Sequence, residues 1–239
     1  MSSDRTDHPP APSPLQVGLI GLFVTALVTA QVTASKLLSF GLPVDLPVIG
    51  ESLVLPGAAL AYALTFFASD CYAELYGRRA ATVVVNVGFA MNFVLLALVW
   101  SAIEAPALPA VAQSFPPGAF RDVLGSSTAI VVASLAAYVV SQNWDVFVFH
   151  RIRESTDGDH LWLRNVGSTA SSQLIDTVIF ITLGFVVLQD TSVDAVSLIA
   201  GQYLFKLGIA VADTPFVYAV VGAARSNADD ASSWVTGSK

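Results

Sequence analysis

The sequence has few charged residues. Only 12% of its 239 residues are Asp, Glu, Lys or Arg, which is about half the fraction typical of a soluble domain. Hydrophobic residues make up 54% of the chain. This combination excludes a disordered chain and argues against a soluble enzyme. The formal net charge of −7 has the wrong sign for a nucleic-acid partner. The composition therefore predicts a single polytopic membrane domain.

Cysteine and histidine are also scarce. Cys71 is the only cysteine, so the chain has neither an intrachain disulfide nor a cysteine cluster for a metal. The histidines at positions 8, 150 and 160 lie outside the long apolar runs. An intramembrane serine protease or a haem-binding span would need histidine inside the membrane, and HExxH and P-loop motifs are absent. These absences predict a protein that is not an enzyme and has no cofactor or metal.

The sequence does contain long runs without Asp, Glu, Lys or Arg. A membrane-spanning helix needs about 20 mostly apolar residues. Six runs approach that length, and their residues are 15–35, 52–69, 80–103, 123–144, 165–189 and 195–224, with Asp176, Lys206 and Asp213 as the charges inside them. The uncharged stretch 105–120 contains four prolines, which favour a loop. The sequence therefore predicts an all-α membrane protein with six transmembrane helices.

The polar ends of the chain set the predicted domain boundaries. Residues 1–14 are rich in proline and of mixed charge, and residues 226–239 are polar and acidic. We expect a disordered cytoplasmic tail over residues 1–14, a six-helix membrane domain over residues 15–225, and an acidic cytoplasmic tail over residues 226–239. Six helices divide into two sets of three, and a duplicated half would then be inverted, as in many transporters. No internal sequence repeat is evident, so the inverted 3+3 repeat stays an open alternative.

Lysine and arginine indicate the orientation. If the N-terminus lies inside, the inner segments carry eight of these residues, and the outer segments carry two, Lys36 and Arg121. Cytoplasmic loops carry an excess of Lys and Arg. Both termini are therefore predicted to lie in the cytoplasm.

Ionisable groups inside the predicted spans are costly. A charge at the bilayer centre costs about 2.5–3.5 kcal/mol and needs a partner or a wet cavity. Asp176 lies in the fifth span, with Gln173 one turn earlier on the same face. Lys206 lies in the sixth span on the face of Gln202, where it could neutralise Asp176. Gln173, Asp176 and Lys206 are candidates for substrate binding, and the alternative is that they join the helices.

A second polar cluster ends the fourth span. Its residues are Gln142, Asn143, Trp144 and Asp145. Two amides, an indole and a carboxylate can recognise a polar ring, so these four are further candidates for substrate binding. Trp144 could instead be an interfacial anchor.

A charged cluster follows the second span. Asp70 and Glu74 are four residues apart on one helical face, and Arg78 is expected to continue that face. With Arg164 they lie on the predicted cytoplasmic side. They form either a solvated cluster that fixes the loops or an inner gate whose ion pairs break during transport.

Three segments resemble a known family. They are LPGAALAYALTFFASDCYAELYGRRAA (55–81), NWDVFVFHRIRE (143–154) and LWLRNVGSTASSQLIDTVIFITLGF (161–185). Together with Ala34-Ser35-Lys36 and the stretch from Lys206 to Phe216, they are similar to the queuosine precursor transporters, also called the vitamin uptake transporter family. Ser69 and Val166 stand where the family pattern has threonine and asparagine.

The resemblance implies a multi-pass protein of the cell membrane that imports queuosine or archaeosine precursors, the 7-deazaguanine bases. Its partners would be this small molecule and the lipid bilayer, and homo-oligomerisation is left open. Under this implication, Asp176 or Asp145 takes the amine edge of the base, and Gln173 or Asn143 takes the carbonyl edge. The alternative is a substrate-capture subunit that depends on a separate ATPase module.

Overall fold

The computed structural model describes residues 11–109, 112, 114–116, 118–156 and 161–236, and the side chains of all of these except 161–165 and 227–236. Most of these residues are helical. The helices are α1 (Pro14–Thr33), α2 (Ala59–Tyr76), α3 (Arg78–Glu104), α4 (Ala119–Gly125), α5 (Ser127–Ser155), α6 (Leu161–Ile181), the π-helical η2 (Thr182–Val187), α7 (Ala195–Ala212) and α8 (Thr214–Thr236).

Five helical stretches in the described part of the chain are long and apolar enough to cross a membrane. They are Pro14–Thr33, Arg78–Glu104, Ala119–Ser155, Val166–Val187 and Ala195–Ser226. The chain is thus a multi-pass membrane protein. The predicted second span corresponds to α2, which is shorter than these five stretches and carries Asp70 and Glu74. A six-span count with both termini inside stays a prediction.

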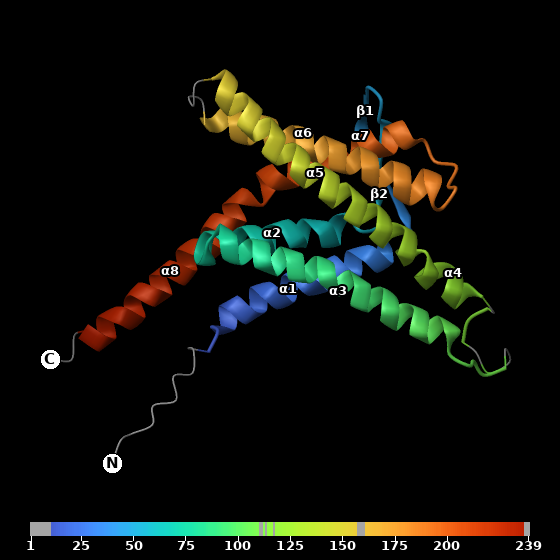
Figure 1. Cartoon of the computed structure of the whole chain (residues 1–239), viewed down its shortest axis with the longest axis horizontal. Helices are drawn as coiled ribbons and strands as arrows, with labels where there is room; N and C mark the ends of the chain where they lie inside the picture. The colour runs from blue at the N-terminus through green and yellow to red at the C-terminus, as the bar shows by residue number, and fades with distance from the viewer. Residues whose placement is uncertain (1–10, 110–111, 113, 117, 157–160, 237–239) are drawn as a thin grey trace, which may run out of the picture.

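The helices form two groups that cross (Figure 1). One group holds α1, α2 and α3, and the other holds α5, α6 and α7. Within the groups, α1 packs along α2, and α5 packs along α6. Small residues let the helices approach closely, and an added methyl group on Gly88 would lie 2.5 Å from the Phe23 ring. The start of α1 and the end of α8 lie on the same side of the molecule.

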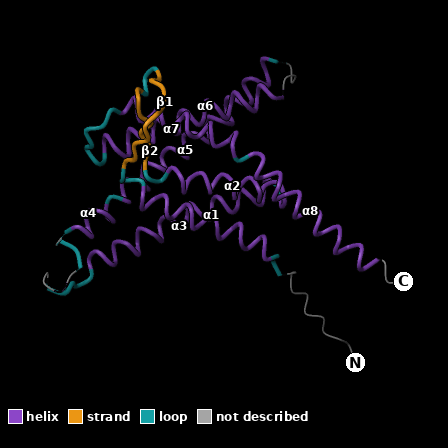
Figure 2. The backbone as a smooth tube through the Cα atoms, turned by 180° about the vertical axis from the view of Figure 1, so that it is seen from behind, coloured by secondary structure: helices purple, strands orange, loops and turns teal. Residues whose placement is uncertain are grey.

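A β-hairpin connects α1 to α2 and corrects the all-α prediction (Figure 2). Strand β1 (Leu37–Leu46) pairs antiparallel with β2 (Gly50–Pro56), with Leu37 opposite Pro56 and Leu46 opposite Gly50. The predicted second span begins at residue 52, whereas α2 begins at Ala59. The prediction counted charge-free residues, and that count does not distinguish an apolar strand from a helix.

Two glycines fix this hairpin against the helices. Gly57 donates its N–H to the Lys36 carbonyl at 2.6 Å, and a methyl group added there would lie 2.5 Å from the Thr33 oxygen. A methyl group on Gly201 of α7 would lie 2.8 Å from the Val54 oxygen. The hairpin backbone therefore touches both α1 and α7 at positions where only glycine leaves room.

The predicted sixth span is divided. Helix α7 ends at Ala212 and α8 begins at Thr214, immediately before Pro215. Proline lacks the N–H that would continue the hydrogen-bond ladder, so the helix is interrupted at Asp213, between α7 and α8. Helix α8 continues to Thr236, so it passes the boundary at 225 that we predict for the membrane domain.

Candidate functional site

A pocket lies where the two helix groups meet. Five helices each contribute residues three or four positions apart, so each helix turns one face toward the pocket. The lining comprises Leu27, Ala30, Gln31 and Ala34 of α1, Ala59, Tyr62, Ala63 and Phe66 of α2, Ile130, Ser134, Ala137 and Tyr138 of α5, Asp176 and Phe180 of α6, and Gln202, Phe205, Lys206 and Ile209 of α7, with Pro56, Ala58 and Phe89. The space free of protein atoms, open solvent at the mouth included, is about 710 Å³. Such an apolar lining with few polar groups is typical of a small-molecule site.

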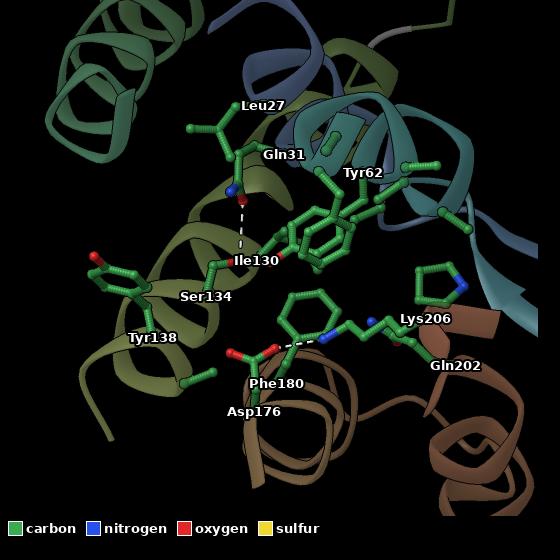
Figure 3. A pocket seen from close by; sticks show the side chains of 18 of the residues that line it. Leu27, Gln31, Tyr62, Ile130, Ser134, Tyr138, Asp176, Phe180, Gln202 and Lys206 are labelled. Carbon is green, nitrogen blue, oxygen red and sulfur yellow. Dashed lines mark hydrogen bonds and ion pairs between the residues drawn. The ribbon is translucent and has the colours of Figure 1, made fainter. Parts of the chain in front are cut away.

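An ion pair between α6 and α7 lies in the pocket wall (Figure 3). Lys206 Nζ donates to Asp176 Oδ2 at 2.6 Å, and the two side chains are only 4% and 15% exposed. Ser141 Oγ donates to Asp176 Oδ1 at 3.4 Å. The ammonium also lies 5.4 Å from the centre of the Tyr62 ring, within the range of a cation–π contact. The predicted neutralisation of Asp176 by Lys206 is confirmed, and the lining residues carry no net charge.

Aromatic rings provide flat surfaces in the same wall. The Tyr62 and Phe66 rings meet edge to face with centres 5.0 Å apart. Phe89 and Tyr138 stack with centres 4.1 Å apart and planes inclined by 26°. The Tyr138 hydroxyl donates to Asn86 Oδ1 at 3.2 Å, which holds this ring in place. Such faces can stack against a planar heterocycle.

Two glutamine amides line the pocket at separate places. Figure 3 shows Gln31 of α1 and Gln202 of α7 at opposite corners of the pocket. Ser134 Oγ donates to Gln31 Oε1 at 3.4 Å. Gln202 Oε1 is buried and has no hydrogen-bond partner among the described residues. A buried acceptor without a partner costs about 1–3 kcal/mol, and a donor group of a ligand that reached this oxygen would remove that cost.

Two of the seven residues predicted to bind substrate line the pocket: Asp176 and Lys206. Gln173, one turn before Asp176, is not part of the lining. Its Oε1 is also buried without a partner in the described part of the chain. Gln173 therefore contributes an unpaired acceptor beside the pocket, whereas Gln202 contributes one within it.

The four candidates at the end of the fourth span lie outside the pocket. The pocket face of α5 includes Ser134 and Tyr138, and none of residues 142–145 is part of the lining. Gln142, Asn143 and Trp144 are exposed.

Other contacts occupy these polar groups. Asn143 Nδ2 donates to the Val139 carbonyl of its own helix at 2.6 Å. Trp144 Nε1 donates to Ser171 Oγ at 3.1 Å. Asp145 Oδ1 accepts from Ser172 Oγ at 3.2 Å. The cluster thus joins α5 to α6, and a direct role in substrate binding stays a prediction.

The charged cluster after the second span differs from the expectation. Gly77 adopts φ 88°, which ends α2, and Arg78 begins α3. The prediction that Arg78 continues the face of Asp70 and Glu74 is therefore wrong. Glu74 Oε2 instead lies 3.9 Å from Arg225 Nη2 of α8, and Arg225 Nη2 lies 3.4 Å from the Glu74 carbonyl. The side chain of Arg164 lies outside the described residues.

Sequence reasoning missed Gln31, Tyr62 and Tyr138 as lining residues. Gln31 had a detectable signal, because it is a buried amide in an otherwise apolar run. Tyrosine is common where apolar helices pack together, so the sequence alone does not mark Tyr62 and Tyr138 as pocket residues. Among the side chains that the structure describes, no three acidic, histidine or cysteine residues come together to hold a metal ion.

Comparison with known proteins gives two matches. Residues 56–220 match the family described as "Putative vitamin uptake transporter". The "Probable queuosine precursor transporter" of Bacillus subtilis (strain 168) is 33% identical over 163 residues, which is 66% of this chain and 68% of that protein. The family match covers the pocket residues of α2, α5, α6 and α7. No solved structure matches the chain.

Proposed function

The chain belongs to the vitamin uptake transporter family, and on this basis we propose that it imports queuosine or archaeosine precursors across the cell membrane. The substrates would be 7-deazaguanine bases such as preQ0 or preQ1. The similar protein from Bacillus subtilis, described as a transporter of a queuosine precursor, supports this substrate class.

The Lys206–Asp176 pair carries the proposal. The pair is buried among aromatic side chains, and its two residues, on α6 and α7, are 30 positions apart in the chain. Charged side chains within a membrane are expensive, and they commonly mark a substrate or ion path. A flat base fits the surroundings of this pair, because the rings offer stacking surfaces and the amides offer hydrogen bonds.

We further propose that transport follows alternating access. The pocket is lined by α1–α3 on one side and by α5–α7 on the other. Rocking of the two groups about this pocket would expose it to each side of the membrane in turn. The hairpin, which contacts both α1 and α7, would have to follow that movement.

Rescue of modified transfer RNA tests the proposed substrate. A strain unable to make 7-deazaguanines would express the chain, and modified transfer RNA would be measured with each base in the medium. We expect rescue by wild type and a loss of about tenfold or more with Asp176→Asn, which leaves Lys206 buried without its counter-ion. Rescue by Asp176→Asn at the level of wild type would contradict the role of the pair.

Uptake into vesicles separates a self-sufficient carrier from a capture subunit. Purified chain would be reconstituted alone, and entry of the labelled base would be measured. Saturable uptake is expected without ATP or any other protein. Saturable binding without uptake would favour the capture subunit that depends on an ATPase module.

A further inference from the structure

Gln202 provides the pocket with a hydrogen-bond acceptor that the described chain leaves unused. Its Oε1 is buried and lacks a partner among the described residues, and the side chain lines the pocket. Gln202 lies one turn before Lys206 on α7, so both side chains project from one face of that helix. Figure 3 shows the two side chains next to each other.

The carboxylate of Asp176 is less available than the sequence suggests. Its Oδ2 binds Lys206 Nζ at 2.6 Å and its Oδ1 accepts from Ser141 at 3.4 Å. A substrate N–H that approached Oδ2 would compete with a charged donor, and a hydrogen bond between charged groups is about twice as strong as a neutral one. Gln202 Oε1 has no such competitor.

We propose that Gln202 is a specificity-determining residue whose Oε1 accepts hydrogen bonds from the amine edge of the transported base. This inference rests on the proposed function. A 7-deazaguanine ring presents a ring N–H and an exocyclic amine side by side. An amide oxygen has two lone pairs and can accept from such an edge.

The assignment predicts how the site discriminates between bases. A base that lacks the exocyclic amine would leave the buried Gln202 Oε1 partly unpaired. Sites built to bind a substrate N–H reject analogues without it for this reason. The preference of wild type for the amine-bearing base should therefore depend on the glutamine oxygen.

The test uses the full chain in lipid vesicles and two probes, 7-deazaguanine and 7-deazahypoxanthine, which lacks the amine. Competition with labelled 7-deazaguanine gives the apparent affinity of each. Wild type should prefer the amine-bearing base by about tenfold. Gln202→Met, similar in length but without the amide, should bind both bases nearly equally.

Gln173→Met is the matched comparison. Gln173 also has a buried, unpaired Oε1, yet it does not line the pocket, so this variant should retain the wild-type ratio between the probes. Gln202→Asn keeps the amide but withdraws it by one methylene, and it should have an intermediate ratio. This second variant also covers the case in which Gln202→Met does not fold.

The outcomes distinguish this inference from the proposed function. If wild type binds neither probe, the proposed substrate is wrong. If wild type discriminates between the probes and Gln202→Met discriminates equally well, Gln202 is not the acceptor, although transport of the base stands. Loss of discrimination in Gln173→Met with its retention in Gln202→Met would assign the role to Gln173 instead.

Discussion

Two ion pairs join helices at different depths of this molecule, and they differ in geometry and surroundings. Lys206 and Asp176 meet at 2.6 Å with side chains 4% and 15% exposed. Arg225 and Glu74 lie 3.9 Å apart with side chains 63% and 64% exposed. Coulomb attraction grows as the surroundings lose polarity, and exposed pairs are screened and often contribute little.

The comparison shows that a count of ion pairs does not identify the site. Breaking the buried pair leaves a charge among Tyr62, Phe180 and other apolar side chains, whereas breaking the exposed pair leaves two groups free to bind water or lipid head groups. The buried pair therefore organises the pocket. The exposed pair can open and re-form at small cost, as a gate requires.

Lys206→Met should have the largest effect. Asp176 would remain buried without its cation, and we expect the free energy of unfolding to fall by about 3–5 kcal/mol. Uptake of the base should be lost. Denaturant unfolding of the purified protein in detergent measures the first effect, and vesicle uptake measures the second.

The double variant Lys206→Met with Asp176→Asn is the control. It removes both charges, so most of the lost stability should return, while uptake should stay absent. Full uptake by the double variant would mean that the pair only holds the helices together. A single variant as stable as wild type would show that the pair is not buried in the membrane.

Lys206→Arg should have an intermediate effect. The charge is kept, but the planar guanidinium is larger and directs its donors differently from an ammonium. Fitting it beside Tyr62 should cost about 1–3 kcal/mol of unfolding free energy. Uptake should fall without being abolished. Arginine that works as well as lysine would mean that charge alone matters at this position.

Ser141→Ala should have a smaller effect. Ser141 Oγ lies 3.4 Å from Asp176 Oδ1 and 3.2 Å from the Tyr138 carbonyl of its own helix, so its one proton is shared between two acceptors. Loss of this donor should cost about 1 kcal/mol of unfolding free energy. Ser69→Ala is the control, because Ser69 Oγ donates to the Phe66 carbonyl of its own helix. An equal loss in both variants would show that Ser141 does not support the carboxylate.

Much of the helical arrangement was predictable from the sequence. Charge-free runs located α1, α3, α5, α6 and the α7–α8 stretch, because water-free surroundings exclude unpaired charges. The hairpin was not predictable by that criterion. Strand β1 contains Pro43 and Asp45, which strands disfavour, and the two strands are recognised only when paired with each other.

The site was only partly predictable. The intramembrane Lys206 and Asp176 were visible because charge in a span demands a partner. Which uncharged side chains face the pocket depends on the rotation of each helix. Helix α1 has no distinct apolar and polar faces, so apart from the single amide Gln31 its sequence does not distinguish the pocket face from the outer face. Rotation of this kind is set by packing between helices.

Glu74→Gln should have the smallest effect, and it tests the exposed pair between Glu74 and Arg225. Its loose pair with Arg225 should contribute about 0.2–1 kcal/mol, and the effect should shrink further as salt is added. Uptake should stay within about threefold of wild type, as a difference of this size allows. Arg225→Gln should have a similar or slightly larger effect, because it also removes the 3.4 Å contact with the Glu74 carbonyl. Loss of uptake at unchanged stability in both variants would instead support the inner gate, since the pair would then matter to a step of transport and not to the fold.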